Sequence, residues 1–427
     1  MAAVGAVNRL REEGVRPTLY DKNDYPGGHT ATFSNPTGFL FDDGPHISFT
    51  KHERLQNLFA ENIGQKYEVI QARVNNYWRG HWIKHPAQCN LYGLPPDLVS
   101  QVLEDFVGVQ GHEVGAVANY QEWLIATYGK TFADTFPTEY GIKYHTTGPE
   151  NMTTDWLGPR LYRPKLEEVL RGALEPVTPD VHYVDHFRYP SKFGFVSYLE
   201  PFYGDCDLKL SHEVTRIDPK RRTLEFASGE KTEYRHLISS MPLPVLIART
   251  AGAPEDVREA AATLACTKCV MVNIGVDRPD ISEAHWSYFY DRDIFFTRLS
   301  FPHMLSPGNV PDGMGSIQVE VYYSDKYRPL DRSPQDCIDP VLADLRRCGL
   351  LRETDKILMS EARVAPYANV IFDLDRPKAL ASVHGYLEDI GIAYCGRYGE
   401  WGYQWTDESF LSGESAAQKI LDRPGSA

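Results

Sequence analysis

A short segment near the start of the chain carries an acid and two glycines at a spacing typical of nucleotide binding. Ala, Val and Leu recur at helical spacing over residues 2–14, and residues 15–20 form a strand-like run that ends at Asp21. This order matches the second half of a βαβ dinucleotide-binding unit, in which the acid accepts hydrogen bonds from ribose hydroxyls. Gly27 and Gly28 then allow the backbone to approach a pyrophosphate closely. We predict a nucleotide-binding unit here; a surface helix followed by an ordinary buried strand is the alternative.

Composition and charge place the chain among large globular proteins. Its 427 residues are 42% apolar, which is enough for a large core and two or three domains. The net charge of −14 opposes a general nucleic-acid partner. No run of about 18 apolar residues occurs, so no membrane span is expected.

The seven cysteines lack the spacing of a disulfide framework, which predicts a reducing, cytoplasmic location. Cys266 and Cys269 have the spacing of a metal or redox pair, but they lie in an alternating, strand-like run with no second pair. We therefore expect ordinary buried thiols and no metal site.

Three stretches resemble segments of the superfamily that contains the amine oxidases, the protoporphyrinogen oxidases and the UDP-galactopyranose mutases. Residues 27–30 are similar to its second flavin signature, and residues 396–407 resemble its closing flavin-binding segment. Residues 44–46 resemble the Gly-Pro-His turn beside the flavin ring of the mutases; a histidine after Gly-Pro is otherwise an ordinary turn residue. The resemblance implies FAD as the cofactor, with contacts from Asp21, Gly27, Gly28, His29, Thr30, Gly44, Pro45, His46, Val214, Gly396 and Arg397.

The glycine-rich loop that opens such a unit is expected just before Met1, because Ala3 stands where its last glycine would fall. Without that loop, the FAD pyrophosphate lacks a cradle of backbone N–H groups. We interpret the pattern as a truncated or late-assigned start; a flavoprotein fold that has lost its chemistry is the alternative.

Arginines and tyrosines stand at positions that hold the substrate in the mutases. Residues 296–298 resemble a strand whose arginine holds the substrate diphosphate, and residues 140–160 resemble the sugar-nucleotide pocket. A diphosphate requires planar, bidentate donors, which arginine supplies better than lysine; for each arginine a surface salt bridge is the alternative. The resemblance implies Arg160, Arg298, Tyr140 and Tyr403 as catalytic residues, and Asn90, His145, Tyr322 and Trp405 as substrate contacts.

The chain also departs from the mutase pattern on the substrate side. His145 stands where the mutases carry a tryptophan, and Gly402 and Trp405 replace an arginine and an acid in the closing motif. These changes leave the identity of the sugar and of the base open.

The resemblance implies an α/β fold, namely a Rossmann-like FAD-binding flavoprotein with an inserted α+β substrate domain. A hairpin expected over residues 213–226, strands over 237–240 and 392–395, and a helix over 409–420 support it. We predict a discontinuous FAD-binding domain formed by residues 1–75, 186–245 and 385–427. A substrate-binding domain is expected to be formed by residues 76–185 and 246–384.

Two classes of enzyme agree with these features. The first is a pyranose–furanose mutase that acts on a nucleotide-diphosphate sugar through N5 of the reduced flavin. The second is an FAD-dependent oxidoreductase of the protoporphyrinogen or amine oxidase type, which needs an apolar pocket such as the aromatic run at residues 286–296 supplies; a buried strand face is the simpler reading of that run. A non-catalytic relative is a third reading, and by analogy with such enzymes a homodimer is expected.

Overall fold

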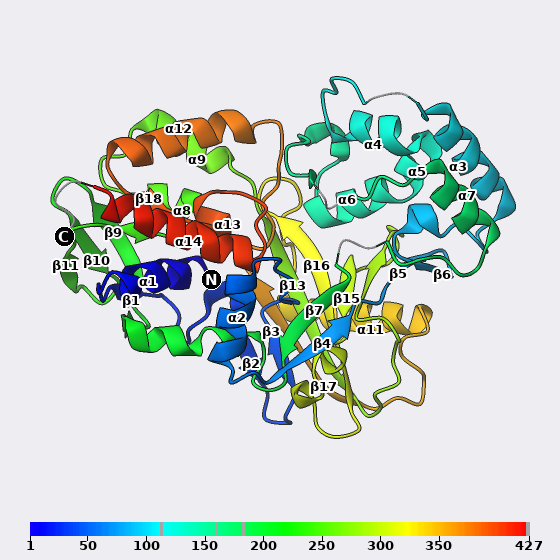
Figure 1. Ribbon diagram of the computed structural model, residues 1–427, viewed down its shortest axis with the longest axis horizontal. Coiled ribbons are helices and arrows are strands. Elements are labelled where there is room, and N and C mark those ends of the chain that lie inside the picture. Colours follow the sequence, from blue (N-terminus) through cyan, green and yellow to red (C-terminus); the bar gives the residue numbers. More distant parts are fainter. Residues whose placement is uncertain (112–113, 159–160, 182–183, 424–427) are drawn as a thin grey trace.

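The computed structural model describes residues 1–111, 114–158, 161–181 and 184–423. A seven-stranded mixed sheet crosses the middle of the molecule (Figure 1). Its two long central strands contain many β-branched residues and are buried except at Lys268, as expected for strands covered on both faces. In spatial order the strands are β17 (Ile357–Ala365), β13 (Thr267–Val276), β16 (Gly315–Ser324), β15 (Arg298–Ser300), β14 (Trp286–Phe289), β5 (Val74–Trp78) and β6 (His81–Lys84).

The register of this sheet places five side chains in a row across it. Met271 on β13 pairs with Arg363 on β17 and with Glu320 on β16, Glu320 pairs with Arg298 on β15, and Arg298 pairs with Tyr288 on β14. Residues at paired positions point to the same face of a pleated sheet. The row therefore carries two arginines and one glutamate on a single face. The opposite face packs its apolar residues against α11 (Ile338–Arg347).

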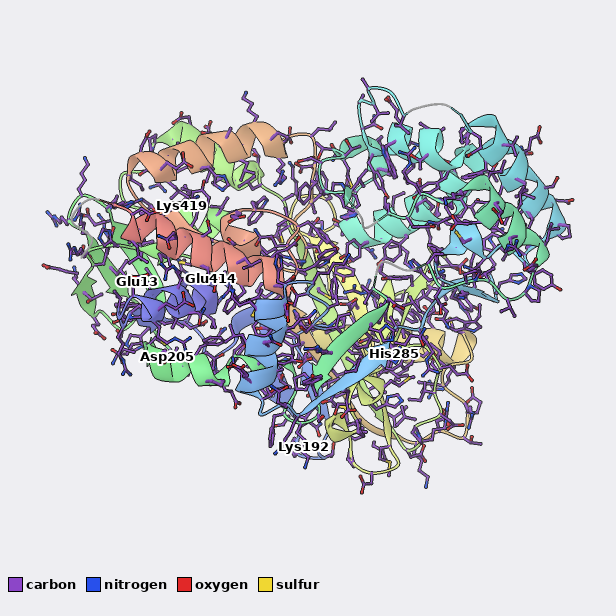
Figure 2. The ribbon with its side chains drawn as sticks, in the orientation of Figure 1. Glu13, Lys192, Asp205, His285, Glu414 and Lys419 are labelled. Carbon is purple, nitrogen blue, oxygen red and sulfur yellow. The ribbon has the colours of Figure 1, made fainter. Side chains whose placement is uncertain are left out.

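The part that the sequence predicts to bind a nucleotide, called the nucleotide-binding part below, is built from both ends of the chain. Helix α1 (Ala2–Glu12) lies along α14 (Thr406–Leu421) in Figure 1. The two helices pack closely because of glycine: a Cβ atom on Gly413 would lie 1.8 Å from the carbonyl oxygen of Ala2. Glu414, labelled in Figure 2, accepts a hydrogen bond of 2.9 Å from Asn8. Close packing and this contact join the two termini into one unit.

Short parallel strand pairs complete this part. Strand β1 (Thr18–Tyr20) pairs with β8 (Asp207–Lys209), and β12 (Ile238–Ser239) pairs with β18 (Ala393–Tyr394). Antiparallel strands β9 (Val214–Asp218), β10 (Thr223–Phe226) and β11 (Lys231–Glu233) form a separate sheet, which confirms the predicted hairpin. The helices here are α8 (Leu243–Arg249), α9 (Glu255–Thr263), α12 (Arg376–Asp389) and α13 (Gly396–Gly399).

A group of helices lies at one end of the molecule, apart from the α1–α14 pair (Figure 1). It packs around buried aromatic residues, among them Tyr128, Phe132 and Phe136. Its members are α3 (Pro96–Gly108), α4 (Tyr120–Tyr128), α5 (Lys130–Thr135), α6 (Pro137–His145) and α7 (Leu166–Leu174).

The remaining elements surround the sheet. Two antiparallel pairs are β2 (Thr32–Ser34) with β3 (Leu40–Asp42), and β4 (Tyr67–Gln71) with β7 (His186–Pro190). The other α-helices are α2 (Glu53–Asn62) and α10 (Pro302–Leu305). The described 3-10 helices are η1 (Gly28–Thr30), η2 (Ala87–Cys89), η3 (Pro149–Asn151), η5 (Phe195–Tyr198), η6 (Glu200–Asp205), η7 (Pro307–Asn309) and η8 (Pro334–Cys337).

Most elements expected from local pattern are present, with shifted boundaries. The first strand is shorter than residues 15–20, and the last helix begins at Thr406 rather than Ser409. All seven cysteines are free thiols; Cys269 is buried, whereas Cys266 is half-buried. Within the described ranges, no helix is long and apolar enough to cross a membrane, and no group of three metal-ligating side chains occurs. The proposed domain boundaries stay a prediction.

Lys143 attaches the helical group to the sheet. Its side chain, on α6, is buried, and its Nζ donates hydrogen bonds to the carbonyl oxygens of Phe289 (3.1 Å) and Asp291 (2.8 Å). Burial lowers the pKa of Lys143 to about 7. These two hydrogen bonds join α6 to the end of β14. Among the described residues, no ion pair includes Lys143.

We predict that this lysine makes stability depend on pH. Because its pKa is 10.5 when unperturbed and about 7 in the fold, the unfolded state binds the proton more tightly between these values. The free energy of unfolding should therefore rise with pH across this window, by up to about 1.4 kcal/mol per pH unit from this group. Chemical denaturation of the wild type and of Lys143→Met should give curves that diverge with pH. The control is Lys66→Met, at an exposed position, whose stability should change with pH as that of the wild type does. If the stability of Lys143→Met also changed with pH in parallel with the wild type, the prediction would be wrong.

Candidate active site

A cavity of ≈ 650 Å³ lies between the charged row of the sheet and the nucleotide-binding part. All five residues of the row line it, together with residues from both ends of the chain. A volume of this order is typical of sites for cofactors and small molecules, which are about 300–1,000 Å³. The sheet therefore forms one wall of a site whose other wall is the nucleotide-binding part.

Asp21 and Val214 lie at the nucleotide end of the cavity. Asp21 follows β1, and its carboxylate accepts a hydrogen bond of 2.9 Å from the backbone N–H of Asn23. Burial raises the pKa of Asp21. The start of β9 is held by Arg249, which donates to the Val214 carbonyl and pairs with Glu213 at 2.6 Å. An acid and backbone polar groups at this end suit the ribose and base of a dinucleotide.

The Gly27-Gly28 turn leaves space on the cavity side. Both residues have positive φ, 101° and 55°. A Cβ atom on Gly27 would lie 2.9 Å from Cγ2 of Val196, so this position has no room for a side chain. A Cβ atom on Gly28 would meet nothing within 4 Å. The turn is therefore packed on its protein side and open on the other, as close approach of a cofactor requires.

Two histidines border the cavity beside this turn. The rings of His29 and His46 are 5.5 Å apart, and Nδ1 of His29 lies 3.2 Å from Oδ2 of Asp43. Nδ1 of His46 lies 2.8 Å from the Gly44 carbonyl, so this nitrogen carries the proton and donates. Burial lowers the pKa of His46 well below its ordinary value. His46 is thus a neutral imidazole in the cavity wall.

Asp42 anchors the loop that carries the second histidine, a role that sequence reasoning missed. Its carboxylate accepts hydrogen bonds from the hydroxyls of Thr32 (2.6 Å) and Tyr189 (2.8 Å) and from the Phe195 N–H (3.1 Å). Its backbone carbonyl accepts a bond of 2.8 Å from Gln318 on β16. Burial raises the pKa of Asp42 to about 6. These bonds attach the loop directly to the sheet.

Arg298 and Glu320 form a buried ion pair at the centre of the row. Nη2 of Arg298 donates to Oε1 of Glu320 at 2.8 Å, and its Nε donates to Oε2. The Glu320 side chain is 4% exposed and that of Arg298 is 23% exposed. Burial opposes the charged guanidinium, but the Glu320 carboxylate and the phenols of Tyr322 and Tyr144 together raise the pKa of Arg298 well above its ordinary value. Glu320 was not among the predicted site residues.

Phenol groups surround this ion pair. The hydroxyls of Tyr144, on α6, and Tyr403, in the tail, lie 3.0 Å apart. The ring of Tyr144 packs on that of Tyr322 at 4.8 Å and stacks on that of Tyr140 at 5.4 Å. Burial raises the pKa of Tyr140, Tyr144 and Tyr322 well above the ordinary value, so these phenols are protonated donors. Tyr144 was not predicted, although its spacing of four from Tyr140 places both on one face of a helix.

Arg397 organises the tail. Its Nε and Nη2 donate to the carbonyl oxygen of Gln404 at 3.0 and 2.7 Å, and its Nη1 donates to that of Ala368 at 3.2 Å. The guanidinium carbon lies 5.0 Å from the ring centroid of Tyr403. Arg397 thereby holds the loop in which Tyr403 and Trp405 reach the cavity.

Most predicted site residues reach this cavity. The predicted residues among its lining are Asp21, Gly27, Gly28, His29, Thr30, Gly44, Pro45, His46, Val214, Arg298, Tyr322, Gly396, Arg397, Tyr403 and Trp405. Arg160 lies outside the described residues. Tyr140, Asn90 and His145 are not among the lining residues: Tyr140 packs behind Tyr144, Asn90 donates to the Pro86 carbonyl, and His145 is buried between Tyr144 and Trp156. The roles assigned to these residues stay predictions.

Comparison with protein families identifies the fold. Residues 195–421 match the model of the flavin containing amine oxidoreductases, and residues 1–61 match that of an NAD(P)-binding Rossmann-like domain. The chain belongs to the flavin-containing amine oxidoreductase family. This membership confirms the predicted α/β flavoprotein fold and the predicted cofactor, FAD.

Solved structures agree with this assignment. A reduced UDP-galactopyranose mutase is similar over 98% of this chain and 93% of its own, with a TM-score of 0.90 and 25% sequence identity. The cyclohexylamine oxidase of Brevibacterium oxydans (TM-score 0.68, 14% identity, 99% and 98% covered) and a putrescine oxidase (0.65, 15%, 99% and 97%) share the fold. The resemblance to mutases and oxidases alike is thereby confirmed.

The residues of the cavity fit a flavin dinucleotide. The acid after β1, the open side of Gly28 and the neutral His46 follow one another along the nucleotide-binding wall. Across from them, the row of the sheet supplies cations and phenols. Polar backbone and an acid at one end, with arginine and tyrosine at the other, suit a cofactor and a second, anionic ligand in one cavity.

We predict that Arg298 and Glu320 are strongly coupled in stability. Replacing one partner leaves the other charge buried, so Arg298→Met and Glu320→Gln should each cost about 2–3 kcal/mol, the lower part of the usual range because Arg298 keeps some exposure. The double variant should cost less than the sum, with a coupling energy of about 1–3 kcal/mol in denaturant unfolding.

A matched control for this double-mutant cycle is the ion pair of Arg292 with Glu139, whose arginine side chain is 62% exposed. The coupling energy of Arg292→Met and Glu139→Gln should be at most about 1 kcal/mol. Additive costs for Arg298 and Glu320 would show that the ion pair contributes nothing beyond its separate side chains.

Proposed function

We propose that this protein isomerises a nucleotide-diphosphate sugar between its pyranose and furanose forms. The observation that carries the proposal is the arrangement around Arg298, where a guanidinium and the hydroxyls of Tyr322 and Tyr403 meet in one cavity with the flavin-binding residues. The similarity to the mutase along 98% of the chain supports it. A diphosphate leaving group suits this end of the cavity.

The ion pair prepares Arg298 for such a ligand. Two of its nitrogens, Nε and Nη2, are used by Glu320, and none of the hydrogen bonds between described residues uses Nη1. The Glu320 carboxylate also balances the buried charge when no substrate is present. Arg298 is therefore held rigidly with one donor group free, so little orientation entropy is lost when a phosphate oxygen binds.

The phenols complete the anion site. Tyr322 lies 3.4 Å from Nη2 of Arg298, and Tyr144 and Tyr403 share a hydrogen bond across the cavity. Because the buried hydroxyls of Tyr144 and Tyr322 have pKa values raised well above the ordinary value, they stay protonated and can donate to oxygens that gain negative charge as the sugar leaves the diphosphate. FAD, when bound and reduced, supplies the nucleophile that exchanges with the diphosphate at the anomeric carbon. The part played by this chain is to position the sugar and to stabilise the leaving group.

An oxidoreductase acting on an amine or another reduced substrate is the second candidate. Trp286 and Tyr288 line the cavity, with Nε1 of Trp286 donating to the Tyr288 hydroxyl at 3.0 Å, and Trp405 adds a third aromatic wall. Phe289 and Phe296, by contrast, belong to the core on the opposite face of the sheet. The apolar wall is thus smaller than the aromatic run suggested, which favours the mutase.

We predict that the dithionite-reduced, FAD-loaded protein converts UDP-galactofuranose to UDP-galactopyranose. Anion-exchange chromatography of the two nucleotide sugars measures this conversion. Arg298→Lys and Tyr403→Phe should each lower kcat/KM by roughly 10–100-fold, since each removes a hydrogen bond to a charged oxygen, worth about 1.5–3 kcal/mol. The exposed Tyr92→Phe is the control and should leave the rate unchanged.

Oxygen consumption distinguishes the alternatives. The oxidised enzyme should consume no oxygen with putrescine or cyclohexylamine. Amine-dependent oxygen consumption without isomerisation would replace the mutase with the oxidase. A protein that binds FAD but shows neither activity would be a non-catalytic relative.

A further inference from the structure

The charged row of the sheet ends in a second arginine that no predicted role covers. Arg363, on the edge strand β17, lines the same cavity as Arg298. Its guanidinium carbon lies 3.5 Å from the ring centroid of Phe33. Its Nε is shielded from solvent and has no hydrogen-bond partner, and none of the ion pairs among the described residues includes it. An unpaired cation inside a cavity is costly unless a ligand supplies the opposite charge.

Carboxylates on this side of the sheet have other partners. Glu361, two residues from Arg363 on the same strand, accepts a hydrogen bond of 3.1 Å from Asn273. Glu320, two strands away in the row, binds Arg298 through both oxygens. Asp43 lies against His29 at 3.2 Å. The row with its two arginines and one glutamate therefore carries one excess positive charge, located at Arg363.

Arg298 and Arg363 stand on strands that are not neighbours in the sheet. Three strand spacings separate them, which is about 14 Å at about 4.8 Å per strand. Gly44 lies over the middle of the row, since a Cβ atom there would be 3.8 Å from Sδ of Met271 and 4.0 Å from Oε1 of Glu320. The flavin-binding turn thus sits between the two arginines, with Arg363 on the side of Phe33 and away from the substrate tyrosines.

We propose that Arg363 stabilises the negative charge of the reduced flavin ring and so raises its reduction potential. Addition of two electrons and one proton to the ring leaves one negative charge on it, and a guanidinium held by an aromatic face in the wall of the same cavity is suited to balance that charge. Charge near the ring is a main means by which a protein sets flavin chemistry. This inference rests on the flavin cofactor and is independent of whether the reaction is isomerisation or oxidation.

The test compares reduction potentials of FAD-loaded variants, with dithionite as the electron donor and a reference dye under anaerobic conditions. Arg363→Met should lower the preference for reduced over oxidised flavin by at least tenfold, which is about 30 mV for a two-electron couple. Arg363→Lys should retain most of the wild-type potential. The exposed Arg352→Met, which loses only a surface pair with Asp280, should match the wild type.

A titration of oxidised FAD into the apoproteins separates the outcomes. The affinity for oxidised FAD should change little in Arg363→Met. Equal loss of affinity for oxidised and reduced FAD, with an unchanged potential, would mean that Arg363 binds the phosphates of the cofactor and would overturn the proposal. The proposal would also be overturned if Arg363→Met changed neither the affinity for FAD nor the reduction potential. If Arg363→Met does not fold, Arg363→Gln removes the same charge and gives the same comparison.

Discussion

The ion pair between Arg298 and Glu320 is the interaction on which the candidate site depends. It exists because strands β15 and β16 pair in a register that places the two residues opposite one another. A guanidinium alone on this wall would pay a large desolvation cost, and a carboxylate alone would repel an anionic substrate. As an ion pair, they keep the Arg298 guanidinium charged with a smaller desolvation penalty and in one orientation. The row built on them extends to Arg363 at one side and Tyr288 at the other.

The second wall of the cavity is tied to this row by hydrogen bonds from distant segments. Gln318, two residues from Glu320 on β16, donates to the Asp42 carbonyl and so fixes the histidine loop to the sheet. Arg397 fixes the tail through the carbonyls of Gln404 and Ala368. A cofactor bound between the two walls would therefore contact parts of the chain that these hydrogen bonds already hold in place, as a preorganised site requires.

Membership of the family does not fix the substrate. Residues 195–421 match the flavin containing amine oxidoreductase model, and this range includes strands β13 to β17 of the sheet wall as well as the closing segment. We expect the choice of reaction to depend on the surroundings of Arg298, where the arginine and the phenols suit an anionic leaving group while Trp286 and Trp405 add apolar surface.

The sequence by itself determined the elements whose signals are local: the first helix, the hairpin of β9 and β10, the last helix and the Gly27-Gly28 turn, because periodicity and turn chemistry lie within a few residues. It also indicated Arg298, through the motif around it. Only the tertiary structure decided that Glu320 and Arg363 line one cavity and that Asp42 anchors the loop beside it. Their partners come from strands far apart in the chain, and an alternating strand pattern fits several registers equally well, so sequence alone does not say which side chains face one another.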